Sequence, residues 1–164
     1  MDKQKRTFIK TLAGSALVAA AFPLFNQSFA SEEATQNWQL TDAAWRARLT
    51  PEQYRVLRGH GTEPSRSSPL DTEKRTGLFH CAGCDLPLYS SAHKYDSGTG
   101  WPSFFQPLTP ESIGTSTDWK LLYPRTEVHC PRCQGHLGHV FDDGPAPTGK
   151  RYCMNGVAMV FKPA

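Results

Sequence analysis

Cys81-Ala82-Gly83-Cys84 and Cys130-Pro131-Arg132-Cys133 are the segments that decide how this chain folds. Each segment can place two thiolates on one short turn, and two such turns facing each other complete a tetrahedral sulfur site. A metal ion shared by both turns would join two loops that start at positions 81 and 130. Cys81, Cys84, Cys130 and Cys133 therefore predict one structural zinc ion.

Three alternatives compete with zinc. Two local disulfides would be strained, because Cys-x-x-Cys closes a very small ring. A thioredoxin-type dithiol requires a helix that starts at the pair, and neither pair opens a helical pattern. A rubredoxin-type iron site uses similar spacing, so iron remains open beside zinc. His80 and His129 adjoin these cysteines and are interpreted as bystanders.

Cys153 is the fifth cysteine of the chain and belongs to neither pair. A lone cysteine on a strand is more often a small buried residue than a nucleophile. Arg151 favours the nucleophile, because a nearby positive charge lowers the pKa of a thiol. His136 and His139 follow the second pair closely and can face one pocket with Cys153, although two ordinary surface histidines are the simpler interpretation.

Short β-like runs separated by Gly, Pro and Asp follow Gly77. The predicted strands are 77–80, 86–90, 101–106, 119–122, 127–129, 139–142 and 151–162, and the last is the longest. Before them, Thr41 can cap a helix over 42–49, and Thr50-Pro51-Glu52-Gln53 can open a second helix that ends at Gly59 and Gly61. Residues 62–76 are predicted to form a surface loop. The expected fold class is α+β and mainly β, with antiparallel sheets and short N-terminal helices.

Residues 1–30 have the features of an export signal: a basic start, a mildly apolar stretch and small residues at Ser28-Phe29-Ala30. The apolar stretch is too short and interrupted for a stable membrane span. Lys5-Arg6 resembles a twin-arginine motif whose first arginine is lysine, and an ordinary Sec signal is the alternative. Export after folding would protect zinc thiolates from oxidation outside the cytoplasm. A periplasmic or otherwise exported location is expected, with residues 31–39 as a tether.

The positive charge of the chain lies in its predicted signal. The chain has 18 Lys and Arg and 15 Asp and Glu, and residues 1–30 hold four of the former and one of the latter. Residues 31–164 therefore carry 14 of each. A neutral mature protein has no bulk attraction to nucleic acid, so no nucleic-acid partner is expected.

Four motifs identify the family that the chain resembles. In order, they are Cys81-Ala82-Gly83-Cys84; Tyr95-Asp96-Ser97-Gly98-Thr99-Gly100-Trp101-Pro102-Ser103-Phe104; His136-Leu137-Gly138-His139-Val140-Phe141-Asp142-Asp143-Gly144-Pro145; and Arg151-Tyr152-Cys153-Met154-Asn155. Together they resemble the methionine-R-sulfoxide reductases (MsrB, SelR domain). The resemblance implies a catalytic domain over residues 40–163, built from two antiparallel sheets with a four-cysteine zinc site.

The resemblance also implies roles for individual residues. Cys153 matches the nucleophile that attacks the sulfoxide sulfur and becomes a sulfenic acid. His139 matches a histidine that helps to protonate the sulfoxide oxygen, with His136 and Asn155 in the same hydrogen-bonding network. Trp101 matches the tryptophan that packs on the substrate methyl group. Arg151 matches an arginine close to the nucleophile.

Thr99 departs from the commonest pattern of this family, in which a cysteine at this position resolves the sulfenic acid. No other cysteine is free here, so an external, thioredoxin-like thiol is expected to regenerate the enzyme. The expected substrates are oxidised proteins that contain methionine-R-sulfoxide, and a monomer is expected. A zinc-ribbon binding module and a general periplasmic thiol oxidoreductase are the alternative functions.

Overall fold

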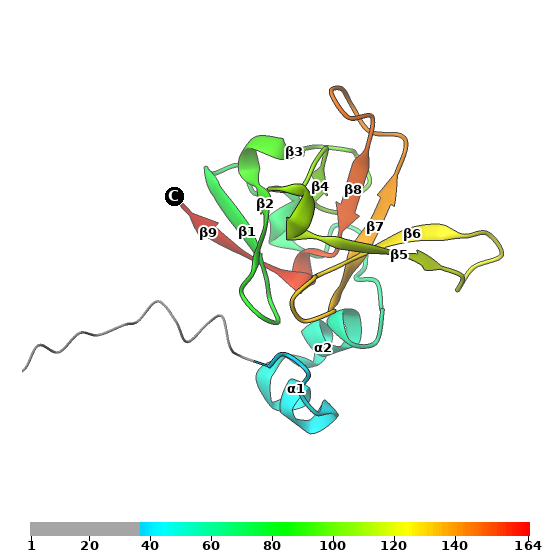
Figure 1. The fold of residues 1–164 in the computed structure, drawn as a ribbon. Coiled ribbons are helices and arrows are strands. Elements are labelled where there is room, and N and C mark those ends of the chain that lie inside the picture. The colour runs from blue at the N-terminus through cyan, green and yellow to red at the C-terminus, as the bar shows by residue number, and fades with distance from the viewer. Residues whose placement is uncertain (1–36) are drawn as a thin grey trace, which may run out of the picture. The chain divides into compact units, whose positions relative to one another are not determined.

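The computed structural model describes residues 37–164 (Figure 1). The predicted export signal, residues 1–30, lies outside the described residues, as does most of the predicted tether. Within residues 37–164, no helix combines the length and the apolar character that crossing a membrane requires.

Two short helices precede the sheets, as the capping residues predicted. Helix α1 (Asp42–Arg48) begins after Thr41, whose side chain accepts the backbone N–H of Ala44. Helix α2 (Pro51–Leu57) begins with a capping box in which Thr50 and Gln53 bond each other's backbone N–H groups. Such caps satisfy N–H groups that the first helical turn leaves free. The buried side chains of the two helices are Trp45, Val56 and Leu57.

Nine strands form two antiparallel sheets in the described part of the chain. The three-stranded sheet has the order β2-β1-β9, with β1 (Gly77–Cys81), β2 (Pro87–Ser90) and β9 (Met159–Pro163). The six-stranded sheet has the order β3-β4-β8-β7-β6-β5. Its strands are β3 (Lys94–Tyr95), β4 (Ser103–Phe104), β5 (Gly114–Asp118), β6 (Arg125–His129), β7 (His136–Phe141) and β8 (Arg151–Met154). The predicted fold class is confirmed.

The prediction of a single long strand over 151–162 is wrong. Strand β8 ends at Met154, a short 3-10 turn covers Gly156–Ala158, and β9 then joins the other sheet. The buried carboxylate of Glu63 accepts the backbone N–H groups of Gly156 and Val157 at 2.6 and 2.8 Å. These two groups are therefore withdrawn from any strand ladder, and the chain passes from one sheet to the other at this point.

Two other predicted strands also differ from the structure. The predicted strand 119–122 lies in the loop between β5 and β6, because its apolar side chains face solvent and pair with no strand. The ladder before that loop is made by the polar residues 114–118, which an apolar pattern does not reveal. The predicted strand 101–106 is shortened to Ser103–Phe104.

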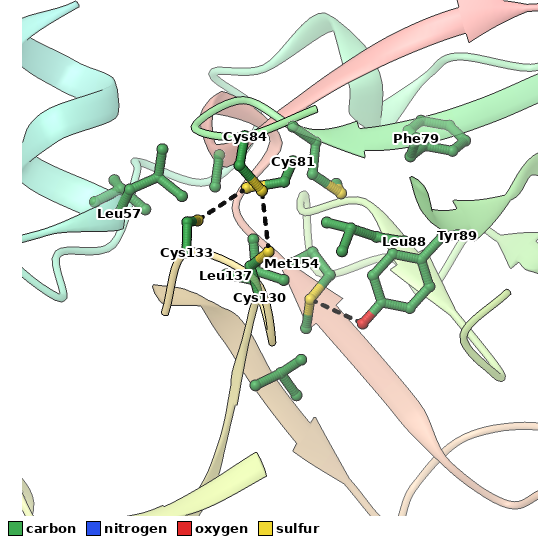
Figure 2. Close-up of a cluster of buried hydrophobic side chains, with 14 of the residues drawn as sticks. Leu57, Phe79, Cys81, Cys84, Leu88, Tyr89, Cys130, Cys133, Leu137 and Met154 are labelled. Atoms are coloured by element: carbon green, nitrogen blue, oxygen red, sulfur yellow. Dashed lines mark hydrogen bonds between the residues drawn. The ribbon is translucent and has the colours of Figure 1, made fainter. Parts of the chain in front are cut away.

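Aromatic side chains pack the two sheets together. Phe104 of β4 lies 4.3 Å from Tyr89 and 5.0 Å from Phe79 between ring centroids. The Tyr89 hydroxyl donates to the Met154 sulfur at 3.2 Å (Figure 2). Successive strand residues point to opposite faces, so burying Met154 directs the neighbouring Cys153 to the other face of the six-stranded sheet.

Candidate active site and metal centre

One row of polar residues crosses the six-stranded sheet. Cys153 of β8 pairs with Ser103 of β4 on one side and with His139 of β7 on the other. The row continues through Glu127 of β6 to Ser116 of β5. Directly paired residues present their side chains on the same face of a sheet. The register therefore places the predicted nucleophile beside the predicted proton donor.

An open pocket lies over this row. Its lining residues are Thr62, Thr99, Trp101, Arg125, Gly138, His139, Phe141, Arg151, Cys153, Met154 and Asn155. Five of the six residues predicted for catalysis or substrate binding are among them. His136, the sixth, does not line the pocket and is 2% exposed.

Partial burial is the main influence on the pKa of the Cys153 thiol. It raises the pKa of Cys153 above its usual value, and Arg151, Thr99 and Ser103 only partly offset this. The hydroxyl oxygen of Thr99 lies 4.0 Å from the Cys153 sulfur. The sequence indicated a lowered thiol pKa, and the structure gives the opposite direction because burial disfavours the thiolate.

Arg151 shares its charge with an acidic partner. Its Nε and Nη2 atoms donate to the two carboxylate oxygens of Asp143, both at 2.8 Å. Its guanidinium carbon lies 4.4 Å from the centre of the Phe141 ring. The carboxylate offsets part of the positive charge near the pocket, and the remaining effect of Arg151 on the Cys153 pKa is outweighed by burial.

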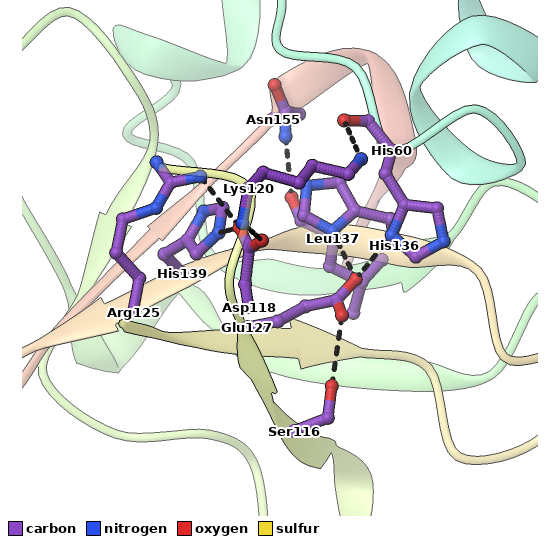
Figure 3. A network of polar contacts seen from close by, with 10 residues as sticks. All are labelled: His60, Ser116, Asp118, Lys120, Arg125, Glu127, His136, Leu137, His139 and Asn155. Atoms are coloured by element: carbon purple, nitrogen blue, oxygen red, sulfur yellow. Dashed lines mark hydrogen bonds and ion pairs between the residues drawn. The ribbon is translucent and has the colours of Figure 1, made fainter. Parts of the chain in front are cut away.

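Asp118 fixes the orientation of His139 (Figure 3). Its Oδ2 atom lies 2.8 Å from His139 Nε2 and 2.7 Å from Arg125 Nη2, and its Oδ1 atom accepts the Lys120 N–H. The Lys120 bond and the His139 bond hold the pKa of Asp118 well below its usual range. Burial lowers the pKa of His139, although Asp118 opposes this. His139 is thus mainly neutral, with the hydrogen on Nε2 and Nδ1 as the proton acceptor.

Glu127 organises a second group of side chains around His136. Its Oε1 atom lies 2.6 Å from His136 Nδ1 and 2.9 Å from His60 Nδ1, and its Oε2 atom accepts the Ser116 hydroxyl at 2.9 Å. Burial alone would raise the pKa of Glu127, but bonds from His136 and Ser116 outweigh it and lower the pKa. Both oxygens of the carboxylate are therefore hydrogen-bonded. The buried Nε2 of His136 has no partner among the described residues.

Asn155 bonds to backbone rather than to the histidines. Its Oδ1 accepts the Glu63 N–H at 2.8 Å, and its Nδ2 donates to the Leu137 carbonyl at 3.0 Å. The Glu63 carbonyl accepts the indole N–H of Trp101 at 3.1 Å. The resemblance implied one network of His139, His136 and Asn155, whereas the structure divides them among three sets of hydrogen bonds. Glu63 connects Trp101, Asn155 and the turn after β8.

Two glycines allow the close approaches that this arrangement needs. Gly100 has a φ of 84°, and a Cβ there would lie 2.1 Å from the Ser65 hydroxyl oxygen. A side chain at Gly138 would lie 2.2 Å from the Cys153 carbonyl oxygen. Only glycine, which has no Cβ, lets the turn before Trp101 approach Ser65 this closely. The same holds for strand β7 at Gly138, where it approaches the Cys153 carbonyl of β8.

The four paired cysteines meet in the core beside helix α2 (Figure 2). Their sulfur atoms all lie within 4.8 Å of one another, with 3.6 Å between Cys81 and Cys133 and 3.4 Å between Cys84 and Cys130. A tetrahedral zinc site with Zn–S bonds of about 2.3 Å separates its sulfurs by about 3.8 Å. A disulfide requires about 2.05 Å. The donor set and its spacing therefore fit a tetrahedral metal ion.

Each cysteine pair is closed by a residue in the left-handed conformation. Asp85 (φ 62°) follows the first pair and Gln134 (φ 58°) follows the second. Their N–H groups donate to the carbonyls of Cys81 and Cys130 at 2.8 and 2.9 Å. Both turns thus present their two sulfurs to the same side.

Sequence reasoning missed three acidic side chains that hold this site. Asp118 and Glu127 orient the histidines, and Glu63 holds the turn after β8. Glu63 lies in residues 62–76, which the sequence predicted to be a surface loop, and it had no role assigned to it. Asp118 and Glu127 bond histidines on another strand, so no spacing within a short stretch of sequence could have identified them.

Comparison with known proteins places the chain in a family. The SelR domain matches residues 49–163. "Peptide methionine sulfoxide reductase MsrB" of Agrobacterium fabrum is 52% identical over 123 residues, covering 75% of this chain and 91% of that protein. The protein of the same name from Thioalkalivibrio sulfidiphilus is 50% identical over 126 residues, covering 77% and 92%. "Peptide methionine sulfoxide reductase B1, chloroplastic" of Oryza sativa subsp. japonica is 49% identical over 124 residues, covering 75% and 58%.

The chain belongs to the SelR domain family of oxidoreductases. Within that family, it is similar over most of its length to proteins named MsrB.

Proposed function

We propose that this protein reduces methionine-R-sulfoxide in oxidised proteins to methionine, with Cys153 as the nucleophile. The observation that carries the proposal is the direct pairing of Cys153 with His139 beneath one open pocket. A sulfoxide is a poor electrophile until its oxygen receives a proton, so a thiol and a proton carrier must meet at one substrate.

The proton can come from Cys153 itself. The thiol is mainly protonated because it is partly buried, and neutral His139 accepts that proton at Nδ1. The resulting imidazolium, held by Asp118, donates it to the sulfoxide oxygen while the thiolate attacks the sulfoxide sulfur. The attack forms a bond between the Cys153 sulfur and the substrate sulfur. The protonated oxygen then moves to the Cys153 sulfur, and the bonds from the methionine sulfur to oxygen and to Cys153 both break. Cysteine is thereby oxidised by two electrons to a sulfenic acid, and the sulfoxide is reduced to methionine.

Trp101 supplies the wall that selects one epimer. Its indole N–H is fixed to the Glu63 carbonyl at 3.1 Å, and Trp101 lines the same pocket as His139. With the substrate methyl group on this ring and the oxygen toward His139, only the R epimer places its sulfur at Cys153. Methionine sulfoxide repair uses one enzyme for each epimer.

Cys81, Cys84, Cys130 and Cys133 would hold one structural zinc ion. When bound, zinc supplies folding energy by joining two loops, and it takes no part in the reaction. The buried, four-sulfur set favours zinc, and elemental analysis would separate it from iron.

An external thiol completes the cycle. Thr99 stands beside Cys153, at the position where the family pattern that the chain resembles has a resolving cysteine, and the other four cysteines are assigned to the proposed metal centre. Two reduced thiols of a thioredoxin-like protein would convert the sulfenic acid to thiol and water and form their own disulfide. We further propose that residues 1–30 export a monomeric enzyme to the periplasm. Fractionation of cells that express the full chain tests this location.

The activity has a direct test. Dabsyl-methionine-R-sulfoxide and a dithiol reductant are incubated with the protein, and methionine formation is measured. The R epimer should be reduced and the S epimer left intact, and Cys153→Ser should abolish the reaction without changing the fold. Equal turnover of both epimers, or a fully active Cys153→Ser variant, contradicts the proposal.

A further inference from the structure

The loop between β5 and β6 exposes four large apolar side chains, Trp119, Leu121, Leu122 and Tyr123, here called the apolar tip. Their exposed fractions are 72, 47, 107 and 61%. They are four of the five exposed large hydrophobic side chains in residues 37–164, and the fifth, Val160, belongs to β9. Single exposed apolar residues are ordinary, but a contiguous group marks a binding surface.

The apolar tip lies along the chain between Asp118 and Arg125, a residue pair that adjoins the proposed active site. Asp118 and Arg125 form the last pair of the β5–β6 ladder and bond each other at 2.7 Å. Arg125 lines the pocket, and Asp118 bonds His139. Figure 1 shows the β5–β6 hairpin projecting away from the other strands of its sheet. The tip therefore begins one residue beyond Asp118, the carboxylate that orients His139.

Polar contacts hold this loop without using its apolar side chains. The Lys120 backbone N–H donates to Asp118 Oδ1 at 2.9 Å. The Lys120 ammonium reaches the His60 carbonyl at 3.3 Å, across the face of the network in Figure 3. The four apolar side chains are thus presented on an anchored loop, which lowers the ordering cost of binding a partner.

We propose that the apolar tip binds the residues that flank methionine sulfoxide in an oxidised, unfolded polypeptide and favours apolar neighbours. This inference rests on the proposed function. Methionine is among the residue types most often buried, so its neighbours in a client include core residues that unfolding exposes. A pocket that takes one side chain leaves the flanking residues on the adjoining surface.

A bilayer is the other partner that an apolar loop suits. Membrane-binding segments usually add several basic residues for anionic lipid. The tip sequence 119–123 contains one, Lys120, whose ammonium already bonds to His60. Residues 31–164 carry 14 basic and 14 acidic side chains, so they add no net electrostatic attraction to an anionic bilayer. The charges favour a polypeptide.

The test compares three substrates: a methionine-R-sulfoxide peptide with Leu and Phe flanks, the same peptide with Ser and Gly flanks, and N-acetyl-methionine-R-sulfoxide amide. In the variant W119S/L122S/Y123S, KM for the apolar peptide should rise about tenfold with kcat unchanged, as expected for losing about 60 Å² of apolar contact. KM for the other two substrates should change less than about twofold. The matched control Val160→Ser removes an exposed apolar side chain from the other sheet and should change none of them. Equal melting temperatures show that both variants fold.

The outcomes separate this inference from the proposed function. If wild-type protein reduces none of the three substrates, the proposed function fails and the inference fails with it. If it reduces all three but the triple variant leaves KM for the apolar peptide unchanged, the tip alone is misassigned. Loss of binding to phosphatidylglycerol vesicles by the triple variant, with unchanged peptide KM, would assign the tip to membrane instead.

Discussion

The hydroxyl oxygen of Thr99 lies 4.0 Å from the sulfur of Cys153. A hydroxyl cannot form a disulfide with oxidised Cys153. In the proposed cycle, this contact therefore predicts that an external thiol regenerates the enzyme.

A single turnover without reductant should leave a sulfenic acid on Cys153. Mass spectrometry should show the gain of one oxygen, and a dimedone-type probe should trap the product. Thr99→Cys should instead yield an internal disulfide, provided that the two sulfurs move to about 2.05 Å. Loss of two hydrogens by wild-type protein would show that a metal-site cysteine resolves the intermediate.

The pKa of the Cys153 thiol should lie above the usual cysteine value of 9.0 because the side chain is partly buried. A raised pKa means that the thiolate is scarce at neutral pH and grows as pH rises. The rate of alkylation by iodoacetamide, measured from pH 6 to 11, should therefore have its midpoint above 9.0. Asp143→Asn should lower the midpoint because it frees the Arg151 charge, and Arg151→Met should raise it. A wild-type midpoint below 9.0 would contradict the raised pKa and support the lowered thiol pKa that the sequence indicated.

Asp118→Asn should slow sulfoxide reduction by roughly 10²-fold or more, because His139 loses the carboxylate that orients it and stabilises its protonated form. His139→Asn should slow the same step by roughly 10²–10⁴-fold. The double variant should be little slower than His139→Asn alone, since both residues act through one proton transfer. Single-turnover kinetics measure the step directly. Multiplied losses in the double variant would mean that Asp118 acts independently of His139.

Cys81→Ser should lower the melting temperature by roughly 10 °C or more, because the energy of binding a structural metal is folding energy. Zinc content should fall from one ion per chain toward none. Cys153→Ser is the matched control, and it should keep both the zinc and the melting temperature. Wild-type protein without a tetrahedral metal, or an unchanged melting temperature in Cys81→Ser, would contradict a structural metal at these cysteines.

Sequence alone predicted the parts of this protein that depend on neighbours a few residues away. The capping box of Thr50 and Gln53 needs one helical turn, and each Cys-x-x-Cys needs one tight turn. Such local geometries recur wherever the residues recur, so spacing was enough for the two helices and for the two turns that carry the paired cysteines. The resemblance added the residues around Cys153, and their catalytic roles stay predictions.

Only the tertiary structure decided where the strands end and which groups meet. Glu63 reaches across 93 residues to the N–H of Gly156 and ends the strand that carries Cys153. Asp118 and Glu127 find their histidines through strand register, which depends on the packing of the whole sheet. The pKa of Cys153 is raised because burial outweighs the positive charge of Arg151. Burial and register arise from remote contacts, and a linear pattern of residues contains neither.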